Sequence, residues 1–146
     1  MLKQFSTIME LKSIRDLKSK LSEREKELSA PLLSDISLIS AIYGWFKEIV
    51  SEEALQPNIE SVTQRKKFLF VILLLFAPST LAGGRLPIGI RDELTKLFPG
   101  LSPYAISHNI SDIAFLYRHY KNFRQDIELI YDGIIRRLGV EPNSGR

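Results

Sequence analysis

The chain of 146 residues contains no cysteine and only two histidines, His108 and His119. The missing cysteines exclude disulfide bonds and thiolate zinc sites, and they leave the redox compartment unspecified. If one helix carries both histidines, their separation in the sequence places them about 16 Å apart along its axis. His108 and Asp112 are one helical turn apart, but two ligands make a poor metal site, so a surface pair is expected. The sequence therefore predicts no bound metal and no other cofactor.

Recognisable catalytic motifs are absent as well. There is no glycine-rich phosphate loop, and the serines show no nucleophile-elbow spacing. The adjacent carboxylates of Asp92 and Glu93 would point in different directions on a helix. We therefore expect a protein that is not an enzyme.

Signals for export or membrane insertion are missing too. Residues 1–20 mix charges throughout and lack the apolar segment of a signal peptide. The unbroken apolar run Phe68–Ala77 has about ten residues, whereas a membrane-spanning helix needs about 20. We expect a cytoplasmic protein with no membrane partner.

Charge is unevenly distributed along the chain. Residues 1–30 carry seven basic and five acidic residues, residues 31–64 carry one and five, and residues 65–146 carry twelve and seven. The formal net charge is +3, and the last of these segments alone contributes +5. A modest basic excess permits an anionic partner such as nucleic acid, but many proteins without such a partner have the same excess.

Hydrophobic periodicity predicts an all-α fold. No segment alternates convincingly with period two, and apolar residues at helical spacing predict about six helices. We expect a helical arm at residues 1–30 and an all-α domain at residues 31–146. Proline and polar residues predict a loop at residues 51–58 and a frayed tail at residues 141–146.

The arm carries a narrow apolar stripe formed by Ile14, Leu17, Leu21 and Leu28. Arg24 interrupts the stripe where a heptad repeat would place another apolar residue. Two interpretations remain open. The arm is either a solvated helix with one face resting on the domain or a helix that forms a homodimer by pairing with a second copy.

A buried central helix is expected at Phe68–Ala77, which is apolar on every face. Ser61 and Gln64 have capping-box spacing at the start of this helix. Its first turn holds three basic residues, Arg65, Lys66 and Lys67. Positive charge is disfavoured at that end of a helix, so the cluster is interpreted either as a set of phosphate contacts or as a solvated helix end.

The last helix is predicted to begin near Asn122, which has capping-box spacing to Gln125. Gly139 is placed to end this helix. Its apolar face is formed by Ile127, Ile130, Ile134 and Leu138.

Residues 86–120 have the form of a helix-turn-helix, a motif that often places its second helix in a DNA groove. The first helix is expected at about Leu86–Phe98 and is followed by a break at Phe98-Pro99-Gly100. Ser102 then offers an N-cap, and Pro103 a first-turn proline, for a longer second helix.

Several features of the C-terminal half occur in an order that is known from one family. A basic pair opens a long apolar helix, Leu86-Pro87-Ile88-Gly89-Ile90 starts the next helix, and Leu97-Phe98-Pro99-Gly100 forms a turn. In these features residues 65–138 resemble the C-terminal DNA-binding domain of the bacterial replication initiator DnaA. Ser102–His108 lines up with the family signature Asp-His-Thr-Thr-Val-Leu-His, with His108 on the final histidine. The resemblance implies a related fold and DNA binding.

The chain departs from this family at several positions. Ser102-Pro103-Tyr104-Ala105 stands where the family has the base-contacting Asp-His-Thr-Thr, and Leu101 stands where an arginine usually precedes it. The ATPase part of the family is missing altogether. The resemblance therefore does not imply replication initiation or the family's specific DNA site.

The spacing along the second helix predicts which of its faces is exposed. One face should be buried and is formed by Ala105, Ile106, Ile110, Ile113 and Tyr117. The opposite face presents Tyr104, Ser107, His108, Ser111 and Asp112. No arginine or lysine occurs between Ser102 and Tyr117. The helix therefore lacks the side chain for the commonest base-specific contact in DNA complexes, the hydrogen bonds from arginine to guanine. The predicted DNA-binding residues are Arg85, Arg91, Ser102, Tyr104, Ser107, His108, Ser111, Arg118, Lys121 and Arg124.

Two functions are compatible with this pattern. The leading prediction is a small helix-turn-helix protein that binds duplex DNA, as a regulator or as an accessory protein of a mobile element. The alternative is an all-α interaction or scaffold protein that does not bind nucleic acid and uses the two-helix corner only as architecture.

Overall fold

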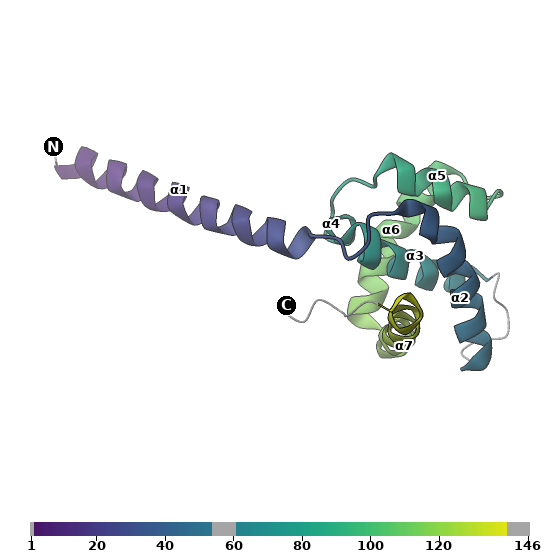
Figure 1. The fold of residues 1–146 in the computed structure, drawn as a ribbon. Coiled ribbons are helices and arrows are strands. Elements are labelled where there is room, and N and C mark those ends of the chain that lie inside the picture. Colours follow the sequence, from purple (N-terminus) through teal and green to yellow (C-terminus); the bar gives the residue numbers. More distant parts are fainter. Residues whose placement is uncertain (1, 54–60, 140–146) are drawn as a thin grey trace. The chain divides into compact units, whose positions relative to one another are not determined.

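The computed structural model describes residues 2–53 and 61–139, and all regular secondary structure among them is helical (Figure 1). The all-α prediction is confirmed. By its internal contacts the chain divides into two units, residues 1–30 and residues 31–146. The predicted tail at residues 141–146 lies outside the described residues, as does the predicted loop at 51–58 beyond residue 53.

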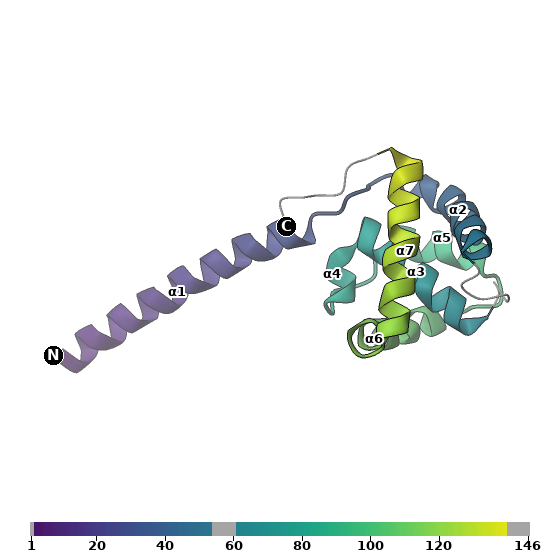
Figure 2. The same cartoon turned by 90° about the horizontal axis from the view of Figure 1, so that it is seen from below.

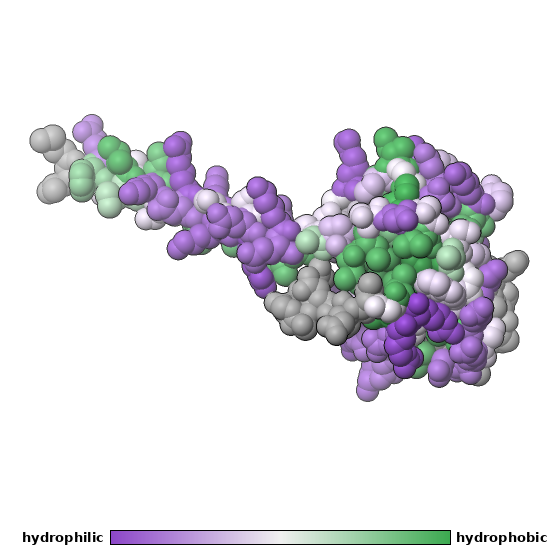
Figure 3. Space-filling model, in the orientation of Figure 1, coloured by the Kyte–Doolittle hydropathy of each residue, from purple (hydrophilic) through white to green (hydrophobic). Residues whose placement is uncertain are grey.

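The first unit is the single helix α1 (Leu2–Ser29). From Lys3 to Leu28 every side chain is exposed. The stripe of Ile14, Leu17, Leu21 and Leu28 is between 44% and 60% exposed. Figure 3 shows a hydrophilic surface along most of α1, with small apolar areas between charged side chains.

The second unit combines the short 3-10 turn η1 with six α-helices among its described residues. These elements are η1 (Ile36–Leu38), α2 (Ile39–Glu52), α3 (Val62–Phe76), α4 (Pro78–Leu81), α5 (Ile88–Leu97), α6 (Pro103–His119) and α7 (Lys121–Leu138).

The buried centre of this unit is α3, as its uniformly apolar sequence predicts. From Lys67 to Ala77 every residue except Leu74 is buried. The helices α2, α6 and α7 pack around α3 (Figure 2). Fully buried side chains on these neighbours include Ile42, Phe46, Ile113, Ile130 and Ile134. Within the described part of the chain, no helix combines the length and the hydrophobicity needed to cross a bilayer.

The two predicted capping boxes have different outcomes. The hydroxyl of Ser61 accepts a hydrogen bond of 3.2 Å from the backbone N–H of Gln64, which caps α3. The side chain of Gln64 is buried without a hydrogen-bond partner, so the second half of that box is not formed. The capping box at Asn122 is wrong, because Tyr120 occupies the N-cap of α7 without a side-chain bond and Asn122 already lies in the first turn. Gly139 ends α7 with φ of +69°, as predicted.

A short helix that the sequence did not predict leads from α3 toward α5. Pro78 follows the C-cap of α3 at Ala77 and opens α4. The hydroxyl of Thr80 is buried and donates a 3.1 Å hydrogen bond to the carbonyl of Arg85. This bond ties the loop that carries Arg85 back to α4.

Candidate nucleic-acid interface

A tight turn joins α5 to α6, at the place that the sequence predicts. Phe98 is the C-cap of α5, and its carbonyl accepts a 2.8 Å hydrogen bond from the N–H of Leu101. Ser102 is the N-cap of α6 and accepts a 3.1 Å hydrogen bond from Ala105. The first helix begins at Ile88 rather than at Leu86, because Pro87 has an extended backbone.

Aromatic contacts fix this turn to the core. The ring of Phe98 meets Tyr43 of α2 edge-on, with 5.3 Å between centroids, and lies 6.0 Å from Phe68 of α3. Tyr43 and Phe68 are themselves 4.8 Å apart. Because the turn is attached to two helices, the start of α6 has a defined position in the domain.

The first turns of α6 present the side chains that the sequence predicts to be exposed. Tyr104 is 80% exposed, and its ring is stacked on His108 with 6.4 Å between centroids and 13° between planes. Ser107 and Ser111 are exposed as well, and the hydroxyl of Ser111 donates a 2.7 Å hydrogen bond to the carbonyl of His108. We call Tyr104, Ser107, His108 and Ser111 the α6 edge.

The opposite side of α6 holds the helix in the core. Ile106 and Ile113 are buried, whereas Ala105, Ile110 and Tyr117 are half-buried. The predicted buried face is thus confirmed at its centre and is partly accessible at its margins.

The sequence analysis did not predict one exposed aromatic residue on this side of α6. Phe115 is 55% exposed and lies one turn after Ser111 on the same side of α6. Its ring is 4.4 Å from His119 and 6.4 Å from Tyr120, which is also 55% exposed. The spacing of four residues from Ser111 was the available signal for this position.

The basic residues around the junction of α6 and α7, which we call the basic end, are Arg118, Lys121 and Arg124, and they lie beyond the first turns of α6. Arg118 and Lys121 are exposed, and Arg124 is half-buried and donates a 3.4 Å hydrogen bond to the carbonyl of Tyr117. Tyr104 and Arg118 are fourteen residues apart in one helix, which corresponds to about 21 Å. The predicted DNA-binding residues on α6 and α7 therefore form two groups, the α6 edge and the basic end.

The two arginines before the turn differ in their surroundings. Arg85 is exposed in the loop before α5. Arg91 is half-buried on α5, lies 3.8 Å from a carboxylate oxygen of Asp92, and has a buried Nε without a hydrogen-bond partner. Arg85 is thus the freer of the two to meet a phosphate.

The basic triplet at the start of α3 does not act as one cluster. Lys67 is 2% exposed and its Nζ lies 2.8 Å from a carboxylate oxygen of Asp126 in α7. The prediction that Lys67 contacts phosphate is wrong, because a buried and paired ammonium group cannot reach a surface ligand. Nζ of Lys66 lies 3.7 Å from a carboxylate oxygen of Asp112 in α6. Asp112 is half-buried beside this lysine and is thus less exposed than predicted. Arg65 is half-buried and faces a pocket beside the turn.

The junction between α6 and α7 contains a tyrosine with a shifted pKa. Tyr117 stacks on Phe70 of α3 with 4.6 Å between centroids, and its hydroxyl donates to a carboxylate oxygen of Glu128 at 3.4 Å. Burial, together with the negative charge and the hydrogen bond of Glu128, raises the pKa of Tyr117 above its ordinary value of 10.0. The nearby charge of Arg124 acts in the opposite direction.

Comparison of the chain with protein-family models, with curated proteins and with solved structures finds no match. Among the described residues, no group of three or more histidine and acidic side chains is placed to hold a metal ion. The candidate interface presents hydroxyl, imidazole, aromatic and basic groups at its surface.

Proposed function

We propose that the domain binds duplex DNA through the corner of α5 and α6, with the α6 edge facing a groove. One observation carries the proposal. Tyr104 and His108 project from the first turns of a helix whose other side is buried, directly after a turn that is anchored in the core. Helix-turn-helix proteins present side chains to base edges in this way. The resemblance of residues 65–138 to the DnaA DNA-binding domain leads to the same expectation.

Phosphate contacts would supply most of the affinity. Arg118, Lys121 and Arg85 are exposed and can approach the DNA backbone. The α6 edge offers single hydrogen bonds from hydroxyl and imidazole groups, but it has no arginine for a bidentate guanine contact. We therefore expect binding that depends steeply on salt and discriminates weakly between sequences.

Fluorescence anisotropy with a labelled duplex, at salt concentrations between about 50 and 200 mM, tests this function. Replacing Arg118 and Lys121 together by glutamine should weaken binding and reduce the slope of log K against log salt by about 2. Arg124 is left unchanged because its bond to Tyr117 supports the helix junction. Absence of binding by the wild type at low salt would refute the proposal.

The matched control replaces Lys47 and Arg136, two exposed residues outside the proposed surface, by glutamine. It removes the same charge and should retain most of the affinity. If the control loses as much affinity as the Arg118 and Lys121 variant, only the net charge matters and the chosen surface is wrong.

We further propose that α1 pairs in parallel with α1 of a second copy. The stripe residues occupy heptad positions a and d, which places Lys20 at g and Glu25 at the following e. Lys20 of one copy would then face Glu25 of the other, with opposite charges on both sides of the pair. Light scattering should give a dimer for the full chain and a monomer for a form that lacks residues 1–29. The same number of chains per particle in both forms would exclude this pairing.

A protein partner is the second candidate function, in keeping with the alternative drawn from the sequence. It is favoured by the exposed rings of Phe115 and Tyr120, because aromatic residues are enriched at protein interfaces. A photo-crosslinking amino acid at Phe115 separates the two functions in cells. Adducts with DNA support the first function, and adducts with a protein support the second. We expect either activity to be cytoplasmic.

A further inference from the structure

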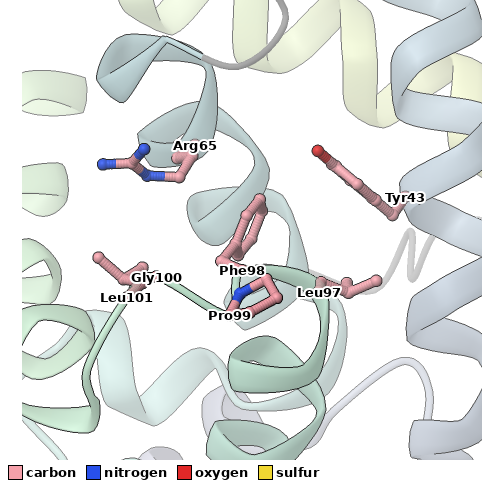
Figure 4. Close-up of a pocket in the computed structure, with 7 residues that line it drawn as sticks. All are labelled: Tyr43, Arg65, Leu97, Phe98, Pro99, Gly100 and Leu101. Atoms are coloured by element: carbon pink, nitrogen blue, oxygen red, sulfur yellow. The ribbon is translucent and has the colours of Figure 1, made fainter.

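A pocket lies beside the turn between α5 and α6. It has a volume of about 310 Å³ and is lined by Tyr43 of α2, Arg65 of α3 and the turn residues 97–101 (Figure 4). Figure 4 shows that these side chains come from three separate elements. The volume is at the lower end of the range for small-molecule sites, which is about 300–1,000 Å³. The pocket therefore suits a ligand of one or two rings.

The walls of the pocket are mostly aromatic and aliphatic. Phe98 and Tyr43 supply rings, and Leu97, Pro99 and Leu101 supply aliphatic surface. A Cβ atom added to Gly100 would meet nothing within 4 Å, so the backbone leaves space on that side. A flat ring could therefore pack against Phe98 or Tyr43 without displacing the turn.

Of the described residues that line this pocket, Arg65 alone is charged. Among the described residues we find no ion pair or side-chain hydrogen bond of Arg65, and its Nε is buried without a partner. A half-buried guanidinium that has no acidic neighbour among residues 2–53 and 61–139 is complementary to an anion, and a carboxylate fits its planar fork.

We propose that this pocket binds a small planar aromatic monocarboxylate. The carboxylate would accept hydrogen bonds from the terminal nitrogens of Arg65, and the ring would pack on Phe98 and Leu101, because Figure 4 shows the guanidinium on the side away from Tyr43. A single arginine and the small volume favour one anionic group over a polyanion. The site is independent of the proposed DNA binding, since it needs neither the α6 edge nor the basic end.

Calorimetric titration of the full chain with benzoate and with indole-3-carboxylate tests this proposal. At least one of the two should bind saturably, whereas benzamide, which has the same shape without the charge, should bind at least about tenfold more weakly. Acetate should bind no better than benzamide, because it lacks the ring. Absence of saturable binding by both aromatic acids, or equal binding of benzamide, would overturn the proposal.

Variants locate the site. Arg65→Gln should weaken carboxylate binding about tenfold or more, and Arg136→Gln, which removes the same charge elsewhere, should change it less than about twofold. Arg65→Lys keeps the charge without the planar fork and should lose an intermediate share of the carboxylate affinity. This variant still tests the site if Arg65→Gln fails to fold. If Arg65→Gln weakens DNA binding but leaves carboxylate binding unchanged, Arg65 is a phosphate contact and the proposed site is wrong.

Discussion

The helices α1 and α3 both lack the one-sided amphipathic pattern of an ordinary surface helix, yet they lie in opposite environments. From Lys3 to Leu28 the charged and apolar residues of α1 are all exposed, whereas α3 is buried on almost every side from Lys67 onward. A helix that buries none of its apolar side chains depends on local terms, and one that is apolar around its circumference depends on its neighbours. The same backbone geometry is thus stabilised by different interactions in the two units.

The largest difference is expected when a large apolar side chain is shortened in each helix. Ile72 of α3 is fully buried, so Ile72→Ala should lower the free energy of unfolding by about 2–5 kcal/mol through lost burial and a cavity. Leu17 of α1 is 58% exposed in the single chain, and Leu17→Ala should change the free energy by less than about 0.5 kcal/mol at concentrations at which the chain is a monomer. Urea unfolding measures both, with the fluorescence of Trp45 reporting on the domain and helical circular dichroism reporting on α1. Equal costs would show that α1 is buried in solution.

Ion pairs sharpen the same comparison. Lys67 and Asp126 are 2.8 Å apart with side chains 2% and 25% exposed, whereas Arg24 and Glu27 of α1 are 3.0 Å apart and 57% and 68% exposed. Asp126→Ala leaves an ammonium group buried without its counter-charge and should cost about 3 kcal/mol. Glu27→Ala should cost less than about 0.5 kcal/mol, because water and salt screen an exposed pair.

A double variant identifies the cause of the Asp126 effect. Adding Lys67→Met to Asp126→Ala removes the unpaired charge and should restore much of the lost stability in the same urea experiment. If the double variant is as unstable as Asp126→Ala alone, the loss comes from packing and not from the buried charge.

Self-association tests whether the exposed stripe of α1 can become a buried one. Arg24→Leu places an apolar side chain at the heptad position that now interrupts the stripe, and it should tighten dimerisation about tenfold. Arg15→Leu adds the same side chain off the stripe and is the matched control. Sedimentation equilibrium measures both. A monomeric Arg24→Leu variant at micromolar concentration would contradict the pairing of α1.

The features that could be predicted from the sequence are those with a local physical cause. The run Phe68–Ala77 is apolar on every face and too short to span a membrane, which predicts a buried helix. Ser102-Pro103 combines an N-cap with a proline that fixes the first turn of α6. The exposure of Tyr104 and His108 follows from the same helical spacing.

Interactions between residues far apart in the chain could not be predicted from the sequence. Lys67 and Asp126 are separated by 59 positions, and no local signal distinguishes the buried Lys67 from the half-buried Arg65 and Lys66. The pocket around Arg65 likewise requires three elements to meet, which periodicity cannot show. At the start of α7 a local signal was present but misleading, because Asn122 has capping spacing and yet Tyr120 precedes the helix.

The smallest effect concerns the edge of α3, where Tyr117 of α6 stacks on Phe70. Because the folded state raises the pKa of Tyr117 above 10.0, the stabilisation from its protonated form is complete below pH 10 and is lost as pH rises through the raised value. Tyr117→Phe should therefore make the fall of stability above pH 10 less steep. Since α1 contains no tyrosine, this response belongs to the domain alone.

Urea unfolding at several alkaline pH values measures the slope of stability against pH. The control variant Tyr104→Phe removes an exposed phenol and should leave the wild-type slope unchanged. A Tyr117→Phe slope equal to that of the wild type would show that the contact with Glu128 contributes nothing to the alkaline response.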